Sequence, residues 1–419
     1  MHIPDLPPQL LAALSEAAGG QRLALVGGVV RDLLLHRHHQ DPWRGLFDLD
    51  VVVEGHASDL MERLPDALRQ HFGASIPLRQ QTHGRFGTVE IELKLPEEFG
   101  GDWLVDLASA RKEVYLEPGI HPQTTPGTIE EDLARRDFTI NAMALELFNR
   151  KPYEKILLDP YGGQKDLACR KLRFLHAHSV KDDPSRVIRA ARYAARLGFE
   201  LDPQSISQIA QTLKDWPWLW KPGSSADDAP PALSSRLRAE MDLLIQREPW
   251  HRALILLQSW GAMAALDISL QKSSLWRRHL PWAARLQVPL ILAITASAED
   301  PLGLAVRLKL SQRQISCIES AQKLIDAMAT PSTSCRTTQK PSEWCTLLEQ
   351  ASCSPLSVGL ALVMGALPVK PILHWWYIWR YVKSPISAQQ LIAQGYPPGP
   401  SLGAELSKLR LKQIDTHQY

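Results

Sequence analysis

Hydrophobic and polar positions follow two different periods along this chain, and the change of period separates a mixed region from a helical one. Residues 23–26 and 47–53 are short, mostly apolar runs, which predict two strands. Residues 87–95 alternate strictly between apolar and polar side chains, as a half-buried strand does, and residues 103–107 predict a further strand. Residues 57–71 have the spacing of a helix. Up to about residue 150 the chain is therefore predicted to be mixed α/β.

Beyond about residue 167 the apolar positions recur with a helical period, interrupted by occasional prolines. Two stretches, 226–233 and 332–341, have the composition of linkers. Residues 116–128 are dense in proline and glycine and predict a mobile loop. The whole pattern predicts an α+β protein in which a head with a mixed sheet and helices precedes an all-helical arm.

The charge of the chain is unevenly distributed. Residues 271–419 contain 16 Lys and Arg against 8 Asp and Glu, a net charge of +8, so the first 270 residues carry −6 of the total of +2. A basic C-terminal third suits contact with phosphate backbones, although an ordinary solvated surface is the alternative. A length of 419 residues leads us to expect two to four domains.

The lack of a signal-peptide pattern and the spacing of the cysteines predict a reducing compartment. The N-terminus lacks the basic start and apolar core of a signal peptide, and no run reaches the roughly 18 apolar residues of a membrane span. The 5 cysteines form no Cys-x-x-Cys pair, so structural zinc is not expected. We expect a cytoplasmic protein without a membrane partner.

Two neighbouring motifs within one βαβ-sized unit carry the first candidate chemistry. Gly27 and Gly28 end the first apolar run and precede a helical pattern, so backbone N–H groups at a helix N-terminus can face phosphates. Asp48 and Asp50 are two residues apart on the second predicted strand and leave the same face of the sheet. Two such carboxylates suit Mg²⁺ when nucleotide phosphates complete its shell. Each motif alone is also compatible with an ordinary turn or a solvated strand.

Asp106 is a candidate third carboxylate on the strand predicted at 103–107. If this strand lies beside the strand of Asp48 and Asp50, the three carboxylates are suited to hold two metal ions. The alternative is an aspartate at a sheet edge that bonds to a neighbouring turn. Glu90 and Glu92 are weaker candidates, which we expect on the solvated face of their strand.

A second charged segment lies at residues 130–144. Arg135 and Arg136 offer guanidinium groups for phosphate or sugar oxygens. Asp137 and Asn141 are four residues apart, so on a helix they would share a face and could hold a ribose. The alternative is a helix N-terminus with acidic residues near the positive end of the dipole and an Arg–Asp surface network.

A third segment, residues 181–199, predicts a helix whose first turn contains Pro184. Its charged stripe consists of Asp183, Arg186, Arg189, Arg192 and Arg196. Like charges on one helix face repel, so an anion is the expected counterpart. A carboxylate only accepts hydrogen bonds and a guanidinium only donates them. Asp183 and Arg186 therefore match the Watson–Crick edges of cytosine and adenine and mismatch those of uracil and guanine.

In this order and spacing, the three segments resemble the class II tRNA nucleotidyltransferases, the bacterial and eukaryotic CCA-adding enzymes with their poly(A) polymerase relatives. The resemblance covers roughly residues 20–200 and rests on these motifs: Gly27-Gly28-x-x-Arg31-Asp32 with Asp48-x-Asp50, residues 106–111, Arg135-Arg136-Asp137 to Asn141, and Asp182-Asp183-x-x-Arg186 through Arg192.

The resemblance implies four domains: a polymerase-β-like nucleotidyltransferase head (1–150), a helical neck that recognises the base (151–225), a helical body that binds tRNA (226–330) and a helical tail that binds the tRNA elbow (331–419). It implies template-independent, Mg²⁺-dependent transfer of CMP and AMP from CTP and ATP to the 3′ end of tRNA, with release of pyrophosphate and without haem or flavin.

The resemblance also implies roles for individual residues. Asp48 and Asp50 would hold the metal ions; Gly27, Gly28 and Arg31 would contact the triphosphate; Arg136, Asp137 and Asn141 would hold the nucleotide and its ribose; Asp183 and Arg186 would read the base; Arg189 and Arg192 would support phosphate or template geometry. The basic residues Lys272, Arg277, Arg278 and Arg285 could follow the acceptor stem, and residues 395–403 are similar to a tail segment of the family.

Two departures qualify the resemblance. Asp182 stands where the family usually has glutamate, which leaves its role in orienting Arg186 open. Residues 83–86 contain one basic residue where poly(A) polymerases tend to have a basic pair, which favours tRNA end building over polyadenylation. Poly(A) polymerase activity and a catalytically inactive RNA-binding protein are the alternatives. The sequence leaves open whether CCA, only CC or only A is added, whether residues 112–128 form a competent flexible loop, and the oligomeric state.

Overall fold

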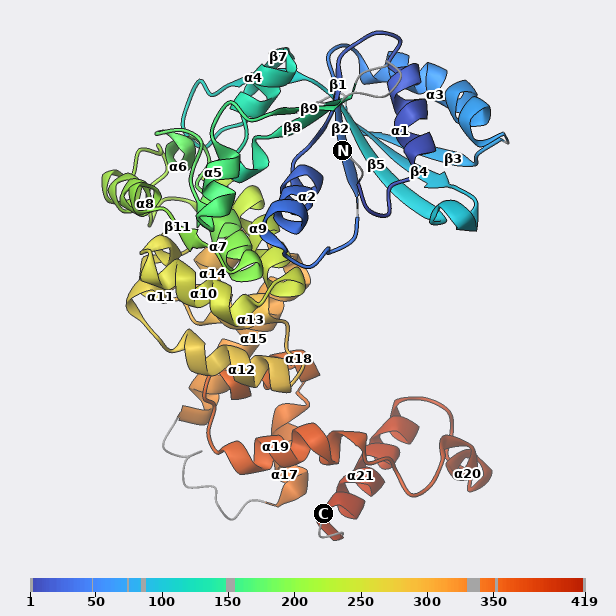
Figure 1. Cartoon of the computed structure of the whole chain (residues 1–419). Coiled ribbons are helices and arrows are strands. Elements are labelled where there is room, and N and C mark those ends of the chain that lie inside the picture. The colour runs from blue at the N-terminus through green and yellow to red at the C-terminus, as the bar shows by residue number, and fades with distance from the viewer. Residues whose placement is uncertain are drawn as a thin grey trace. The chain divides into compact units, whose positions relative to one another are not determined.

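The computed structural model describes residues 3–46, 48–73, 75–83, 88–147, 155–329, 340–350 and 353–416 (Figure 1). The chain divides into two compact units. The first comprises residues 1–221, 230–232 and 246–262, and the second comprises residues 222–229, 233–245 and 263–419. The candidate site residues from Gly27 to Arg192 all lie in the first unit.

The first unit is built on a sheet of seven described strands in the order β3-β4-β5-β2-β1-β8-β9. The strands are β1 (Leu23–Val26), β2 (Leu49–Val53), β3 (Leu78–His83), β4 (Thr88–Lys94), β5 (Asp102–Ser109), β8 (Ala144–Leu147) and β9 (Lys155–Leu158). Neighbours are antiparallel except β2 and β5, which run parallel. The predicted strands at 23–26, 47–53, 87–95 and 103–107 are confirmed as β1, β2, β4 and β5, although Phe47 and Gly87 lie outside the described residues.

Two helices cover one face of this sheet and a short helix covers part of the other (Figure 1). Helix α3 (Ala57–Phe72), predicted at 57–71, packs on α1 (Pro8–Ala17) and on β4 and β5. On the opposite face, Ile129 and Leu133 of α4 (Ile129–Ala134) form an apolar cluster with Ala24 and Val52. A capping box of Thr128 and Glu131 starts α4, because it satisfies backbone N–H groups of the first turn.

The other elements of the first unit connect the sheet to a helical part. They are α2 (Gly28–His39), the hairpin of β6 (Arg111–Val114) and β7 (Gln123–Pro126), the 3-10 helices η1 (Glu97–Phe99), η2 (Thr139–Asn141) and η4 (Pro231–Leu233), α5 (Gly163–Ala168), the pair β10 (Lys171–Leu172) and β11 (Glu200–Leu201), α6 (Ser179–Asp182), α7 (Ser185–Leu197), α8 (Pro203–Asp215) and α10 (Trp250–Ser259).

The second unit consists of helices in the residues that the structure describes. They are η3 (Ala226–Asp228), α9 (Ser235–Arg247, of which the last two residues belong to the first unit), η5 (Ala262–Ala265), α11 (Ile268–Lys272), α12 (Trp276–Arg285), α13 (Leu290–Ala296), α14 (Pro301–Arg307), α15 (Gln312–Ala329), α17 (Pro341–Leu348), α18 (Pro355–Val363), α19 (Val369–Tyr377), η6 (Trp379–Tyr381), α20 (Ala388–Ala393) and α21 (Pro400–Thr416). The four basic residues Lys272, Arg277, Arg278 and Arg285 are exposed on α11 and α12.

The structure differs from the sequence-based expectations in four places. β1 and β2 are antiparallel, so the segment from β1 to β2 is not a parallel crossover. β9 lies beyond residue 150 and still pairs with β8, so the sheet continues past the expected end of the head, and the region after it contains the short pair β10 and β11. Residues 123–126 pair with 111–114 instead of forming an open loop. The predicted linker at 226–233 contains two 3-10 helices, and most of the linker predicted at 332–341 lies outside the described residues.

Within the described residues, helices that combine the length and the apolar character needed to cross a membrane are absent.

Candidate active site

The turn between β1 and α2 brings three predicted site residues together. Gly27 has φ +72°, a left-handed conformation that glycine adopts readily. A Cβ atom at this position would lie 3.0 Å from Oδ2 of Asp50 and 3.3 Å from Nη1 of Arg136. Helix α2 begins at the next residue, Gly28. The predicted phosphate turn, a predicted metal ligand and a predicted nucleotide-binding arginine therefore meet at Gly27.

The carboxylates form a row across neighbouring strands. Asp50 of β2 is paired in register with Asp106 of β5, and Asp106 is paired with Glu90 of β4. Because side chains of paired residues leave the same face of a sheet, Asp106 lies beside Asp50, which is one of the two arrangements that the sequence left open. Glu90, expected only on a solvated face, also lies in this row.

Crowding of negative charge changes the protonation of Asp50. Burial, followed by the charges of Asp48 and Asp106, raises the pKa of the Asp50 carboxyl to about 6, while the charge of Arg136 acts in the opposite direction. Asp48 itself is exposed just before β2. An ionised Asp50 is thus costly in this protein without a cation.

The donor set fits a magnesium ion that shares its shell with phosphates. Among the residues that the structure describes, no group of three or more His, Cys, Asp or Glu side chains is placed to hold a metal ion. Asp48 and Asp50 supply hard oxygen ligands, and Mg²⁺ commonly takes one or two carboxylates while substrate phosphates and water supply the rest. The residues that would hold the ion are therefore Asp48 and Asp50.

Arg136 is held by a buried carboxylate but keeps capacity for a ligand. Its Nη2 donates to Oδ2 of Asp132 at 3.0 Å, and the Asp132 side chain is fully buried. Its Nε is buried and has no hydrogen-bond partner among the described residues. A buried donor of this kind costs free energy unless a water or another group accepts a hydrogen bond from it.

Asp137 and Asn141 are close together, but not on one helix. Helix α4 ends at Ala134, so the helical geometry expected for residues 137–141 is wrong. Nδ2 of Asn141 nevertheless donates to Oδ1 of Asp137 at 3.2 Å. Between them, Phe138 is extended, fully buried and bridged to Phe174, so this segment does not continue as a helix.

Arg31, expected at the triphosphate, lies in this internal network. It donates to both carboxylate oxygens of Asp32 at 2.8 and 2.9 Å and to Oδ1 of Asn141 at 2.9 Å, and it is 4% exposed. Its guanidinium also lies over the Tyr193 ring. We infer that Arg31 ties α2 to the segment of Asn141 rather than presenting a free charge to phosphates.

Asp183 and Arg186 stand at the start of α7 and are both buried. Oδ1 of Asp183 accepts from the backbone N of Ser185 at 3.0 Å and from its hydroxyl at 2.6 Å, so it binds the first residue of the helix. Arg186 donates to two backbone carbonyls, those of Ser179 at 3.4 Å and Arg135 at 3.3 Å. Burial raises the pKa of the neighbouring Asp182, against the charge of Arg186. Asp182 and Arg186 therefore interact electrostatically.

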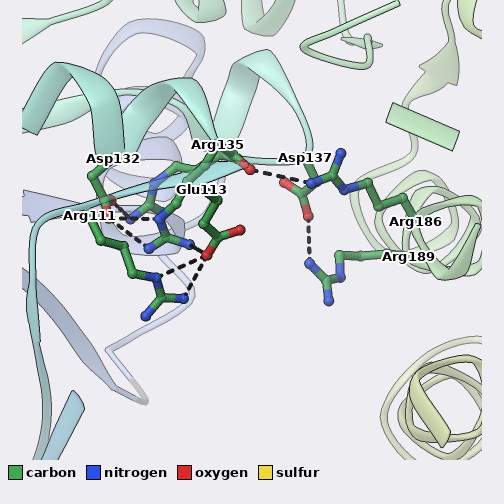
Figure 2. A network of polar contacts seen from close by, with 8 residues as sticks. Arg111, Glu113, Asp132, Arg135, Asp137, Arg186 and Arg189 are labelled. Carbon is green, nitrogen blue, oxygen red and sulfur yellow. Dashed lines mark hydrogen bonds and ion pairs between the residues drawn. The ribbon is translucent and has the colours of Figure 1, made fainter. Parts of the chain in front are cut away.

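The rest of the arginine stripe on α7 is neutralised by protein carboxylates. Nη1 of Arg189 donates to Oδ2 of Asp137 at 3.0 Å (Figure 2). Although burial raises it, the charge and hydrogen bond of Arg189 lower the pKa of Asp137 overall. Arg192 and Arg196 lie 3.4 and 3.5 Å from the two carboxylate oxygens of Glu248, whose side chain is 1% exposed. For these three arginines the expected anion is supplied from within the fold.

Three acidic residues that organise the site were not predicted. Asp132 binds Arg135 and Arg136, Glu113 binds Arg111 and Arg135, and Glu248 binds Arg192 and Arg196. The available signal was weak, since Asp132 stands three and four residues before two arginines on a predicted helix. Glu113 stands two residues after Arg111, which suits a pair on one strand face, but nothing local indicates its contact with Arg135 or the contacts of Glu248.

Comparisons with known proteins relate this chain to enzymes that act on tRNA. Residues 23–173 match the family model described as the poly A polymerase head domain. The CC-adding tRNA nucleotidyltransferase of Deinococcus radiodurans is 36% identical over 330 residues, which cover 76% of this chain and 75% of that protein. The A-adding tRNA nucleotidyltransferase of Aquifex aeolicus is 38% identical over 192 residues, 46% of this chain but 20% of that longer protein.

The fold is shared with a solved structure of a CCA-adding enzyme in complex with CTP. The TM-score is 0.71, and the alignment covers 100% of this chain and 96% of that chain at 22% identity. At this identity the likeness establishes the fold alone.

Proposed function

This chain belongs to the class II tRNA nucleotidyltransferases, and we propose from the geometry of its first unit how the transfer is carried out. Its reaction joins a nucleotide to a tRNA 3′ end. The hydroxyl attacks the α-phosphorus of the incoming triphosphate, a P–O bond forms, and the bond to pyrophosphate breaks. The observation that supports our assignment most is the meeting of Gly27, Asp50 and Arg136 at one turn.

In this proposal Asp48 and Asp50 hold Mg²⁺, and Asp106 completes the row of carboxylates beside Asp50. When bound, the ion would supply charge neutralisation at the phosphates and activation of the attacking hydroxyl. The turn at Gly27 and Gly28 directs backbone N–H groups at the triphosphate. Arg136, whose Nη1 lies beside Gly27 near the Asp50 carboxylate, donates to a phosphate oxygen.

Asp183 and Arg186 read the base. Asp183 accepts from the exocyclic amine of cytosine or adenine, and Arg186 donates to the adjacent ring nitrogen. Uracil presents a ring N–H and a carbonyl at these positions, so each group would face a mismatch. Discrimination of this kind is strong when the protein groups are buried, because an unmatched buried group costs free energy, and both residues are buried. Asp137 and Asn141 place the ribose next to this pair.

The second unit and the helical part of the first bind tRNA. We propose a head that extends beyond the expected residue 150 to the end of β9 at Leu158, a base-reading neck from there to residue 225, a tRNA-binding body (226–330) and a tail (331–419) that reaches the tRNA elbow. The four exposed basic residues of α11 and α12 support the assignment of the body, because tRNA backbones are read through shape and phosphates. The activity places the protein with its substrate in the cytoplasm.

One experiment tests the proposed function. A tRNA transcript that lacks its terminal CCA, and one that ends in CC, are incubated with Mg²⁺ and with CTP alone, ATP alone or both. We expect addition to stop after at most three nucleotides, and the arms show whether the chain adds CC, A or all three. Continued adenylation would indicate a poly(A) polymerase instead. Absence of addition with intact tRNA binding would indicate an inactive RNA-binding protein.

A variant in the metal site tests the residue assignment. Asp48→Ala is expected to retain tRNA binding and to lose nucleotide addition by orders of magnitude, because the metal ion loses one of its two protein ligands. Unchanged addition would contradict the assignment of Asp48.

A further inference from the structure

The row of carboxylates across the sheet ends in Glu90, which has no part in the mechanism proposed above. Glu90 of β4 is paired in register with Asp106 of β5, which in turn is paired with Asp50 of β2. Neighbouring strands lie about 4.8 Å apart, so the backbone of Glu90 is roughly 10 Å from that of Asp50. Glu90 therefore extends the row away from the two residues assigned to the metal ion.

Glu90 lies on the face of the sheet that α3 does not cover. Along β4, buried residues alternate with partly exposed or exposed ones, and the buried set faces α3. Glu90 belongs to the partly exposed set, as Asp106 does on β5. The Glu90 carboxylate has no hydrogen bond or ion pair with another residue that the structure describes. A substrate that approaches this face of the sheet can therefore reach its oxygens.

The order of the strands sets the direction from which the tRNA end approaches. In the proposed function the triphosphate is held at the turn after β1, and β1 and β5 lie on opposite sides of β2 in the sheet. Phosphoryl transfer requires the attacking and leaving oxygens to be roughly in line. Because the pyrophosphate leaves on the β1 side of Asp50, the attacking hydroxyl arrives from the β5 side. The terminal ribose of the tRNA then lies over Asp106 and Glu90.

We propose that Glu90 accepts a hydrogen bond from the 2′-hydroxyl of the terminal tRNA ribose and thereby positions the neighbouring 3′-hydroxyl for attack. The proposal rests on the proposed function, in which the Gly27 turn and the metal ligands fix the direction of attack. A carboxylate only accepts hydrogen bonds and a hydroxyl donates one, and a charged acceptor makes this bond strong. Since the 2′-hydroxyl distinguishes RNA from DNA, Glu90 would also select a ribose end.

Glu92 provides the matched control on the same strand. It lies two residues beyond Glu90, so its side chain leaves the same face of the sheet. It is exposed, and it is paired with Leu104 rather than with a carboxylate of the row. Glu90→Leu and Glu92→Leu therefore each remove one negative charge from this face of β4, and only the first removes the acceptor beside Asp106. Glu90→Gln removes the charge but keeps an oxygen that accepts a hydrogen bond.

The full-length protein is assayed with Mg²⁺, CTP and ATP on tRNA transcripts that lack CCA or end in CC, each with a 2′-hydroxyl or a 2′-hydrogen on its last nucleotide. The readout is the ratio of kcat/KM for the ribose end over the deoxyribose end. We expect a ratio of at least about ten in the wild type and in Glu92→Leu, as a charge-assisted hydrogen bond provides. In Glu90→Leu the ratio should fall below about three, because the ribose end loses the bond that the deoxyribose end never makes. Glu90→Gln should keep an intermediate ratio.

A wild-type ratio in Glu90→Leu overturns the role of Glu90, since a variant that only lost stability lowers both rates and leaves their ratio unchanged. Asp48→Ala separates this outcome from failure of the proposed function. If Asp48→Ala adds nucleotides at the wild-type rate, the metal assignment is wrong and the direction of attack falls with it. If it loses addition while Glu90→Leu keeps the ratio, the metal site stands and ribose binding by Glu90 is wrong. Should Glu90→Leu fail to fold, Glu90→Gln must lower the ratio and Glu92→Gln must not.

Discussion

Gly27 is the residue at which small size matters most, because its missing side chain leaves room for contacts from two other elements. Gly27→Ala would combine an unfavourable φ of +72° with a Cβ atom 3.0 Å from the Asp50 carboxylate and 3.3 Å from Arg136. We expect nucleotide addition to fall by at least a hundredfold, because the metal ligand and the phosphate-binding arginine are both displaced. Steady-state rates on saturating tRNA measure this.

The control for this prediction is Gly20→Ala. Gly20 also has a left-handed conformation, with φ +90°, but it has open space around its Cβ position. Its substitution measures the cost of backbone strain alone, and we expect activity within about threefold of the wild type. Similar losses in both variants would mean that strain, rather than the crowding of Asp50 and Arg136, explains the effect.

The pKa of Asp50 predicts how the metal-free protein responds to pH. This carboxyl has a pKa of about 6 in the folded chain against a usual value of 3.8, so the folded state binds the proton more tightly than the unfolded state. Its contribution to stability is therefore favourable at low pH and is lost as the pH rises from about 4 to 6. Relative to the wild type, Asp50→Asn should become more stable over this interval, by about 1–3 kcal/mol.

Chemical denaturation of both proteins in EDTA at pH 4.5 and pH 7 measures this difference. Addition of Mg²⁺ at pH 7 should reduce the advantage of the variant, since a cation stabilises the ionised wild-type carboxylate and not the amide. An advantage that is equal at both pH values would show that Asp50 titrates normally.

At the residue scale, the motif residues could be predicted but their partners could not. Asp50 and Asp106 were recognised as possible neighbours because each lies on a short predicted strand, and the register of β2 and β5 confirms it. Glu113 and Glu248 act on arginines 22 and 56 positions away. A local pattern contains no information about contacts at that separation, so the neutralised part of the arginine stripe was mistaken for a surface awaiting an anion.

Among the elements, α7 depends on one acidic side chain. Glu248 lies between α9 and α10 and contacts Arg192 and Arg196, and burial lowers the pKa of Arg196. Glu248→Gln would leave two arginines near each other without their carboxylate. Removal of one partner of a buried ion pair costs about 3–5 kcal/mol, and we expect a loss of this order in the free energy of unfolding, measured by urea denaturation.

Asp66→Asn serves as the comparison for Glu248→Gln. Asp66 pairs with Arg69 on α3, and both side chains are largely exposed. Solvent screens such a pair, so we expect a change below about 0.5 kcal/mol. Equal effects of the two substitutions would contradict the view that burial makes the Glu248 contacts important.

The period of hydrophobic residues predicted β1, β4, β5 and α3 well, because each has one buried and one solvated face or a single apolar run. It failed where long-range contacts decide the conformation. The segment after α4 was expected to be helical, but Phe138 is extended and its ring stacks on that of Phe174. Residues 116–128 contain turn-forming prolines and glycines, yet β7 pairs with β6 and Gly119 is bonded on both sides.

At the scale of the whole molecule, the uneven charge predicts a salt-dependent contact with tRNA. Replacement of Lys272, Arg277, Arg278 and Arg285 by alanine removes four exposed positive charges from the second unit. Each lost phosphate contact should reduce the slope of log affinity against log salt by about 1. We expect weaker tRNA binding with a shallower salt dependence and an unchanged rate at saturating tRNA, measured by filter binding and by turnover.

Arg69→Ala removes an exposed charge from α3 of the first unit and is the control for the basic residues of α11 and α12. Its salt slope should equal that of the wild type. If the variant with all four alanine substitutions keeps the wild-type salt slope, the basic residues of α11 and α12 do not contact tRNA phosphates and form an ordinary solvated surface.

The direction of strand pairing and the last strand of the sheet could not be predicted from the sequence. Strand periodicity does not specify the direction of pairing, so the antiparallel relation of β1 and β2 had no local signal. The end of the head was expected at residue 150, yet β9 at Lys155–Leu158 completes the sheet. A four-residue edge strand is too short to be distinguished from a loop by its pattern.

Asp132 has a consequence for how this protein can change during evolution. Its single buried carboxylate holds both Arg135, whose carbonyl supports Arg186, and Arg136, which meets Asp50 at Gly27. If Arg136 and Arg186 have the roles proposed above, we expect a mutation of Asp132 to alter substrate choice and catalytic rate together, so selection on the rate would act against it. Heritable shifts in nucleotide preference would instead be open to positions that contact Arg186 and do not contact Asp132.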